Sequence, residues 1–212
     1  MRIIDTEDDL AEGVAHLVAV EPRFARAVEA AGMPPLRRRP QGFAPLLRII
    51  VGQQVSVAAA DGIWRRVVAA GVETPGQVLA MSDEDLRALG LSRPKVRYAR
   101  AIAGAITDGS LDLDACAHGS VQDAMAMLTA VTGIGTWTAE IYLMFCVGRA
   151  DILADKDLAL QEGARLLFDL PARPDPKALS AMAQAWSPWR GVAARVLWSY
   201  YHVVKGREGV GS

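Results

Sequence analysis

Apolar residues recur every three or four positions along most of the chain, which is the spacing of one face of an α-helix. The clearest case is segment 93–106, whose apolar and basic positions separate: Val96, Ala99, Ala103 and Ile106 share one face, and Lys95, Arg97 and Arg100 lie elsewhere. No stretch shows the alternation of a half-buried strand, and nothing repeats at a fixed period. The pattern therefore predicts an all-α protein.

Further helices are expected over 53–70, 121–131, 136–147, 156–168, 176–185 and 188–204. Thr6 with Asp9, and Ser82 with Asp85, have the spacing of capping boxes that open two more. Glycine and proline place breaks at 32–35, 74–76, 132–135 and 171–176. The glycine-rich tail 206–212 is expected to be flexible.

Composition and charge mainly exclude classes of protein and kinds of site. The 212 residues are 51% hydrophobic and 22% charged, which fits a packed core and argues against disorder. The start has no signal-peptide pattern, no apolar run could span a membrane, and Cys116 and Cys146 are too few for a zinc or iron–sulfur site. We expect a cytoplasmic protein. Its net charge of −1 does not favour nucleic acid.

The two-glycine turn Thr132-Gly133-Ile134-Gly135, followed by a helix from Thr136, is the first candidate for chemistry. Glycines permit positive φ, so backbone N–H groups can point outward at the start of the second helix and bind a phosphate without a basic side chain. The alternative is an ordinary connection with a glycine C-cap.

Four segments, in this order along the chain, resemble the helix–hairpin–helix DNA glycosylases, and most of all the alkylation-repair branch, DNA-3-methyladenine glycosylase II. They are 49–60 around Gln53-Gln54, 128–139 around the two-glycine turn, 154–160 around Asp157, and 186–198 ending at Trp198. The family usually has proline where this chain has Thr132. The resemblance implies a two-lobed helical glycosylase over 1–205, with lobe 1 at about 1–50 plus 171–205. Lobe 2 would span about 51–170, carry the helix–hairpin–helix at 121–147, and have no β-domain before it.

The resemblance assigns the catalytic carboxylate to Asp157, twenty residues after Trp137. Breaking an N-glycosidic bond builds positive charge on the sugar, and a carboxylate can stabilise that charge and activate water. The alternative role for Asp157 is a helix cap, although Asp155 is the better cap by position. Trp137 and Trp198 are expected to stack on the extruded base, with Ile141 where a relative has a third aromatic. As ordinary core tryptophans they would need no ligand.

Family members that also cut the DNA backbone use a lysine at the position of Trp137. We therefore expect a monofunctional enzyme without lyase activity. The turn Gln53-Gln54-Val55-Ser56 is expected to enter the duplex as the base is flipped, with Gln54 or Val55 as the wedge. Alternatively, Gln53 and Gln54 cross-link helices. The hairpin residues 132–136 would hold DNA phosphate, and the backbone of Thr132 and Ile134 could hold Na⁺ or K⁺.

The expected function is excision of alkylated bases of the 3-methyladenine class from damaged double-stranded DNA. The expected enzyme is a monomer that needs no cofactor for hydrolysis and, in a bacterium, is associated with the nucleoid. Two alternatives stay open: a non-catalytic helix–hairpin–helix DNA-binding module, and a glycosylase for oxidised guanine.

Overall fold

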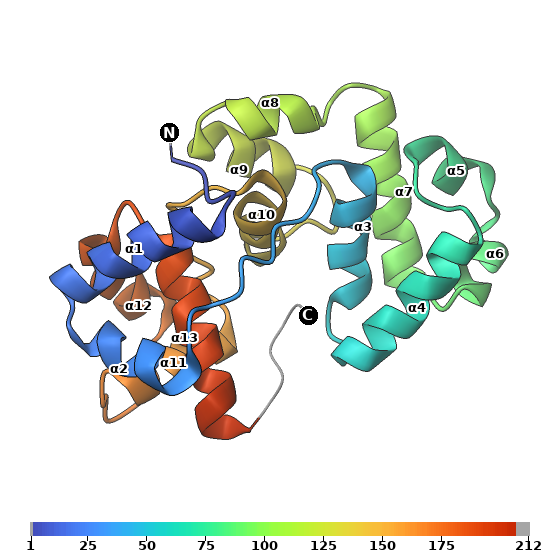
Figure 1. The fold of residues 1–212 in the computed structure, drawn as a ribbon. Coiled ribbons are helices and arrows are strands. Elements are labelled where there is room, and N and C mark those ends of the chain that lie inside the picture. The colour runs from blue at the N-terminus through green and yellow to red at the C-terminus, as the bar shows by residue number, and fades with distance from the viewer. Residues whose placement is uncertain (1, 207–212) are drawn as a thin grey trace. The chain divides into compact units, whose positions relative to one another are not determined.

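The computed structural model describes residues 2–206, which form helices joined by short loops (Figure 1). Within this range the β-type pairing is limited to one bridge, between Ile3 and Arg149. The predicted all-α class is confirmed, and residues 2–206 contain no β-domain. None of the helices in this range combines the length and apolarity needed to cross a bilayer.

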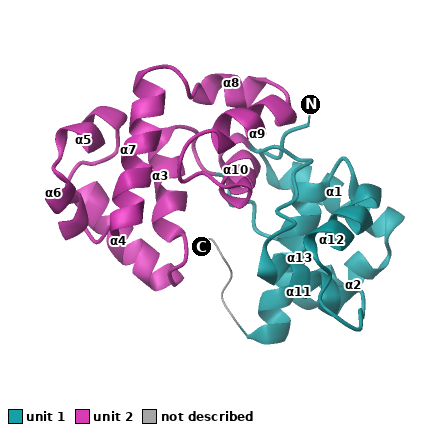
Figure 2. Ribbon diagram, turned by 180° about the vertical axis from the view of Figure 1, so that it is seen from behind, with its two compact units in different colours: residues 1–38, 148–212 teal, residues 39–147 magenta. Residues whose placement is uncertain are grey.

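The chain divides into two compact units, coloured separately in Figure 2. Unit 1 comprises residues 1–38 and 148–212, and unit 2 comprises residues 39–147.

Unit 1 is built around α13, in which every residue from Gly191 to Trp198 is buried. Helices α1, α2 and α11 pack against it. Gly163 of α11 faces the backbone of Leu197, and a Cβ at this glycine would lie 2.6 Å from the Leu197 carbonyl oxygen. A glycine here lets α11 approach α13 closely. The helices of unit 1 are α1 (Glu7–Val20), α2 (Arg23–Ala31), α11 (Leu158–Leu167), α12 (Pro176–Met182), the 3₁₀ turn η2 (Ala183–Trp186) and α13 (Arg190–Lys205).

Unit 2 is organised around α7, which packs against α3, α5 and α6. Helix α10 continues into a fully buried π-helical segment, η1, and packs against both α3 and α9. The helices of unit 2 are α3 (Phe43–Gly52), α4 (Val57–Ala69), α5 (Pro75–Ala80), α6 (Asp83–Ala88), α7 (Arg93–Thr107), α8 (Leu113–His118), α9 (Val121–Thr129), α10 (Thr136–Tyr142) and η1 (Leu143–Val147).

The predicted lobe boundaries near residues 50 and 170 are wrong. Residues 39–50 belong to unit 2, because α3 packs against α4, α7 and α10. Residues 148–170 belong to unit 1, because α11 packs against α13 and α2. The expected flexible tail 206–212 lies outside the described residues except for Gly206, which ends α13 in the left-handed conformation (φ 61°).

Local capping signals are confirmed at two helix starts. Thr6 and Asp9 form a reciprocal capping box on α1, and the hydroxyl of Ser82 accepts the Asp85 amide at the start of α6. Each signal lies within four residues, so it is legible without tertiary information.

Other helix boundaries differ from the prediction. The helix expected over 53–70 begins at Val57, because Ser56 is its N-cap and residues 53–56 form a turn. The expected break at 74–76 is the start of α5, where Thr74 caps the helix in a box with Gln77. Helices α2, α3, α5 and α8 were not predicted.

Candidate functional site

Asp157 lies at the N-cap of α11, in unit 1, and is 7% exposed. Its Oδ1 accepts two hydrogen bonds, from the Leu160 amide at 2.8 Å and from the indole Nε1–H of Trp198 at 3.0 Å. The expectation that Asp155 is the better cap is wrong. The structure gives the capping role to Asp157 and fixes its carboxyl from two directions.

The loop before Asp157 is held by its own contacts. The Asp155 carboxylate accepts a hydrogen bond from the hydroxyl of Ser180 on α12 at 2.6 Å. The Asp155 carbonyl accepts one from Nε2 of the buried Gln161 at 2.8 Å, and the Asp157 amide donates to the carbonyl of Ala154. This loop therefore presents Asp157 in a fixed position.

Trp198 is 2% exposed, and the close approach of α11 to α13 at Gly163 brings its indole to Asp157. Unit 1 thus joins two of the predicted site residues through a direct hydrogen bond that the sequence did not indicate. The stacking of Trp198 on a base stays a prediction.

The two-glycine turn joins α9 to α10 in unit 2 as a helix–hairpin–helix. Gly133 has φ 99°, and a Cβ there would overlap the side chain of Tyr98 on α7. Ile134, between the two glycines, is buried, with 3% of its surface exposed. Thr132 and Gly135 are exposed, Thr136 is half-buried, and Gly135 is the N-cap of α10.

The turn between α3 and α4 presents Gln54 and Val55 to solvent. Gln54 is exposed with φ 56°, and Val55 is 39% exposed. Ser56 is the N-cap of α4, where its hydroxyl accepts the Ala59 amide. Both candidates for the wedge lie at the tip of this turn, so the choice between them stays open.

Gln53 has a different role from its neighbour. Its Nε2 donates to the carbonyl of Gly133 at 3.2 Å and to the hydroxyl of Thr138 at 2.9 Å. The alternative interpretation, that Gln53 cross-links helices, is therefore correct for this residue, and it joins the two turns predicted to contact DNA.

Trp137 and Ile141 lie on α10, in unit 2. Trp137 is half-buried, and Ile141 is 6% exposed. Their contact with an extruded base stays a prediction.

The prediction that Lys95 lies away from the buried face of α7 is wrong. Lys95 is 7% exposed, its Nζ donates to the Val51 carbonyl at 2.7 Å, and burial lowers its pKa. The spacing of Lys95, Ala99 and Ile102, at i, i+4 and i+7, was the signal that could have placed it on the buried face.

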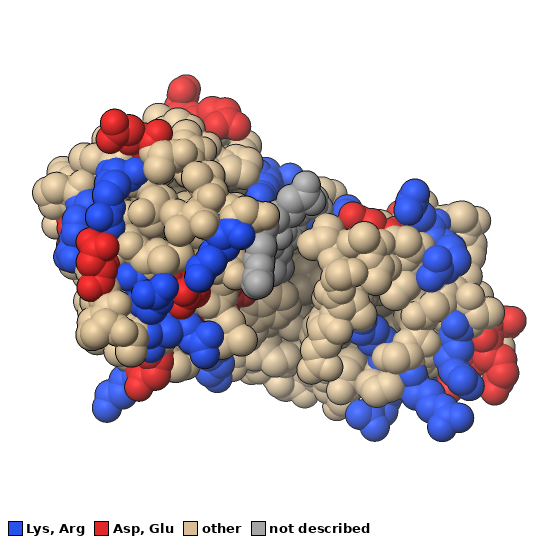
Figure 3. All heavy atoms as spheres, turned by 90° about the horizontal axis from the view of Figure 1, so that it is seen from below, with Lys and Arg blue, Asp and Glu red and all other residues tan. Residues whose placement is uncertain are grey.

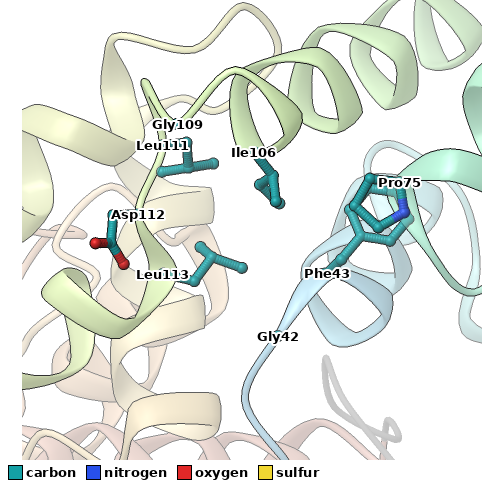
Figure 4. A pocket seen from close by; sticks show the side chains of 8 residues that line it. All are labelled: Gly42, Phe43, Pro75, Ile106, Gly109, Leu111, Asp112 and Leu113. Carbon is teal, nitrogen blue, oxygen red and sulfur yellow. The ribbon is translucent and has the colours of Figure 1, made fainter.

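A separate cavity of about 420 Å³ lies in unit 2 (Figure 4). It contains none of the predicted site residues. Its lining is Gly42, Phe43, Pro75, Ile106, Gly109, Leu111, Asp112 and Leu113.

Side chains offer no metal site in the described part of the chain, where no three His, Cys, Asp or Glu residues cluster. The predicted ligands of Na⁺ or K⁺ are instead the backbone carbonyls of Thr132 and Ile134, on either side of the Gly133 carbonyl that accepts Gln53. Carbonyl oxygens are ligands that such cations accept in proteins. Cation binding at the hairpin stays a prediction.

Residues 47–190 match the family model described as "HhH-GPD superfamily base excision DNA repair protein". The match covers more than half of the chain and includes both turns and Asp157. The chain belongs to the HhH-GPD superfamily.

Two curated relatives are named as DNA-3-methyladenine glycosylases. DNA-3-methyladenine glycosylase 1 of Schizosaccharomyces pombe is 28% identical over 197 residues, covering 89% of this chain and 86% of that protein. DNA-3-methyladenine glycosylase 2 of Escherichia coli is 28% identical over 164 residues, covering 72% of this chain and 55% of that protein.

Solved structures agree with this assignment. DNA-3-methyladenine glycosidase of Bacillus halodurans has a TM-score of 0.82 at 34% identity, covering 97% of this chain and 95% of that one. The S. pombe enzyme in complex with abasic DNA has a TM-score of 0.80 at 28% identity, covering 88% and 95%. An 8-oxoguanine glycosylase/lyase of Clostridium acetobutylicum, at 15% identity, covers 93% of this chain and 71% of that one with a TM-score of 0.79, and shares the fold alone.

Proposed function

We propose that this protein is a monofunctional DNA glycosylase that excises alkylated bases of the 3-methyladenine class from double-stranded DNA. The observation that carries the proposal is the Asp157 carboxyl group, buried at the start of α11 and fixed by the Leu160 amide and the Trp198 indole. The superfamily match and the names of the relatives support the substrate class.

The reaction breaks the bond between the sugar C1′ and the base nitrogen. An N-alkylated purine already carries positive charge and departs easily. The main contribution to the barrier is then the positive charge that develops on the sugar. One carboxylate opposite that cation can stabilise it and orient or deprotonate the attacking water. Hydrogen bonds that hold Oδ1 fix the carboxylate before the substrate arrives, which reduces the reorganisation needed in the transition state.

Access to the base requires DNA distortion. The hairpin presents backbone around Gly133 and Gly135, and backbone amides of this kind can bind phosphate. The exposed tip formed by Gln54 and Val55 would fill the space left by the extruded base. Segment 86–107, which includes α7, contains basic residues and no Asp or Glu, so it adds local positive charge next to the hairpin.

The decisive measurement is release of free 3-methyladenine or 7-methylguanine from methylated duplex DNA by chromatography. We expect release by the wild type and a loss of about 100-fold or more in Asp157→Asn, because Asn cannot supply the negative charge. Asn is as good an N-cap as Asp, so the Tm should change little.

The matched control is Asp175→Asn, which changes another N-cap aspartate of unit 1, bonded to the Ala178 amide at 2.7 Å. It should keep wild-type release. Near-normal release by Asp157→Asn would contradict the catalytic role, and DNA binding without release by the wild type would support the non-catalytic alternative.

Trp137 supports the absence of a lyase step, because its side chain has no amine to attack the sugar from this position of the hairpin. We expect borohydride to trap no protein–DNA crosslink during turnover, with a known glycosylase/lyase as positive control. A crosslink that forms with the wild type would overturn this part of the proposal.

The proposed enzyme acts as a monomer in the cytoplasm, associated with the nucleoid in a bacterium. Gel filtration with light scattering tests the oligomeric state, and fractionation of the source cells tests the location.

A further inference from the structure

The turn between α3 and α4 is tied to α7 through a buried ammonium group. Val51 is in the last turn of α3, where carbonyls have no partner within the helix. Lys95 supplies that partner at 2.7 Å, and it does so from a position that is 7% exposed. Burying a lysine is unfavourable unless its charge is well compensated, so this contact fixes the end of α3 relative to α7.

A second tie runs from the turn to the hairpin. Gln53 is the first residue after α3, and its amide reaches the Gly133 carbonyl and the buried hydroxyl of Thr138. These acceptors lie on either side of the start of α10. The backbone that leads into Gln54 is therefore held directly by the hairpin.

A third contact closes the network. Tyr98, one turn after Lys95 on α7, packs against Gly133 so closely that a Cβ on this glycine would overlap its side chain. Helix α7 thus holds the turn through Lys95 and the hairpin through Tyr98, while Gln53 joins the turn to the hairpin. All of these residues belong to unit 2.

The backbone conformation of Gln54 is consistent with this network of contacts. It is a non-glycine residue with φ 56°, a conformation that persists only where the surroundings enforce it. The contacts of Lys95 and Gln53 supply such surroundings just before Gln54.

We propose that Lys95 and Gln53 are positioning residues that hold the Gln54–Val55 tip at a fixed spacing from the hairpin. This inference rests on the proposed function. When the hairpin binds a phosphate, a fixed spacing places the tip at the base to be extruded. The free energy of phosphate binding at the hairpin then favours insertion of the tip into the duplex.

The test compares Gln53→Met and Lys95→Met with matched controls elsewhere. Gln184→Met removes another glutamine that donates to a backbone carbonyl, that of Ser180. Arg65→Met removes an exposed positive charge from α4, which is in unit 2 and outside segment 86–107. Two substrates are used: a methylated purine paired in a duplex, and the same purine opposite an abasic position, where extrusion requires little help.

Both positioning variants should release the paired base about tenfold more slowly or worse, because Lys95→Met loses one hydrogen bond and Gln53→Met loses two, and we expect the loss in the extrusion step. Release opposite the abasic position should stay within about twofold of wild type. In an Asp157→Asn background, where chemistry is blocked, they should also reduce the fluorescence rise of 2-aminopurine beside the lesion. The controls should match wild type in each assay.

An equal loss on the two substrates would overturn the inference, because it would indicate general damage to the protein. Unchanged extrusion in both variants would overturn it as well. If Lys95→Met fails to fold, as judged by its Tm, the half-buried Gln53 still allows the test through Gln53→Met. Wild-type extrusion without base release would contradict the proposed function, whereas normal wild-type release with unaffected variants would contradict only the positioning role.

Discussion

The carboxyl oxygen Oδ1 of Asp157 accepts the Leu160 amide, so it caps α11, and it also accepts the indole of Trp198. The sequence presented capping and catalysis as alternative roles for this residue. The structure makes them compatible, because the bond from Leu160 satisfies the helix end and, together with the bond from Trp198, orients the group proposed to face the sugar cation.

At the residue scale, Trp198→Phe separates the aromatic ring of Trp198 from its hydrogen-bond donor. Phenylalanine keeps an aromatic ring but loses the Nε1–H donor to Asp157. We expect kcat to fall about tenfold with little change in KM, because the lost hydrogen bond orients the catalytic group more than it binds substrate. Single-turnover base release measures the effect.

Trp186→Phe is the matched control, since Trp186 is also 2% exposed in unit 1 and packs against Phe24 and Phe168. It should cost about 1–2 kcal/mol of stability, as other losses of core volume do, without changing kcat. Unaltered kcat in Trp198→Phe would mean that the hydrogen bond has no catalytic role.

At the scale of elements, the hairpin depends on α7 as much as on its own glycines. Gly133 needs its positive φ for the turn and its missing Cβ for Tyr98. Only the first requirement is visible in the sequence, because Tyr98 and Gly133 are brought together by packing.

Gly133→Ala should therefore destabilise the fold by about 1–3 kcal/mol and weaken DNA binding, because alanine is strained at φ 99° and its Cβ displaces Tyr98. Urea unfolding and binding to abasic duplex measure the two effects.

Gly104→Ala gives a control of opposite sign. Gly104 lies within α7, and a Cβ added there would meet nothing within 4 Å, so alanine should stabilise the protein by about 0.5–1 kcal/mol. Equal effects of the two alanines would show that the packing of Tyr98 on the hairpin is unimportant.

At the scale of the whole molecule, the 23 Lys and Arg residues nearly balance the 24 Asp and Glu residues. On the face in Figure 3, Lys and Arg side chains are interspersed with Asp and Glu. The net charge of −1 thus fits an enzyme whose hold on DNA comes from backbone groups and local basic segments such as α7. Such binding should remain modest and weaken with salt.

Stability at alkaline pH is a second property of the whole molecule. Tyr142 is fully buried, its hydroxyl accepts the Gly42 amide at 3.1 Å, and burial raises its pKa to about 12. An unfolded tyrosine has a pKa near 10. The native state therefore retains a proton that the unfolded state loses, and stability should fall by about 2–3 kcal/mol as the pH rises from about 10 to about 12.

Tyr142→Phe removes this titration. Urea unfolding by circular dichroism between about pH 9 and about pH 12 should give a smaller decrease in stability for the variant than for the wild type. Parallel decreases in the two proteins would show that Tyr142 does not contribute.

The sequence by itself determined the helical class, the capped starts of α1 and α6, the two-glycine hairpin and the place of Asp157 among four ordered motifs. The helical class, the caps and the hairpin depend on residues close together in the chain, since periodicity and capping act over one or two turns. The place of Asp157 came from the resemblance of the four motifs to a known family. The tertiary structure alone decided that Trp198 meets Asp157, that Gln53 reaches the hairpin, and that the units divide at residues 38 and 147. These outcomes depend on how distant helices pack, and no local pattern encodes which side chains then share a hydrogen bond.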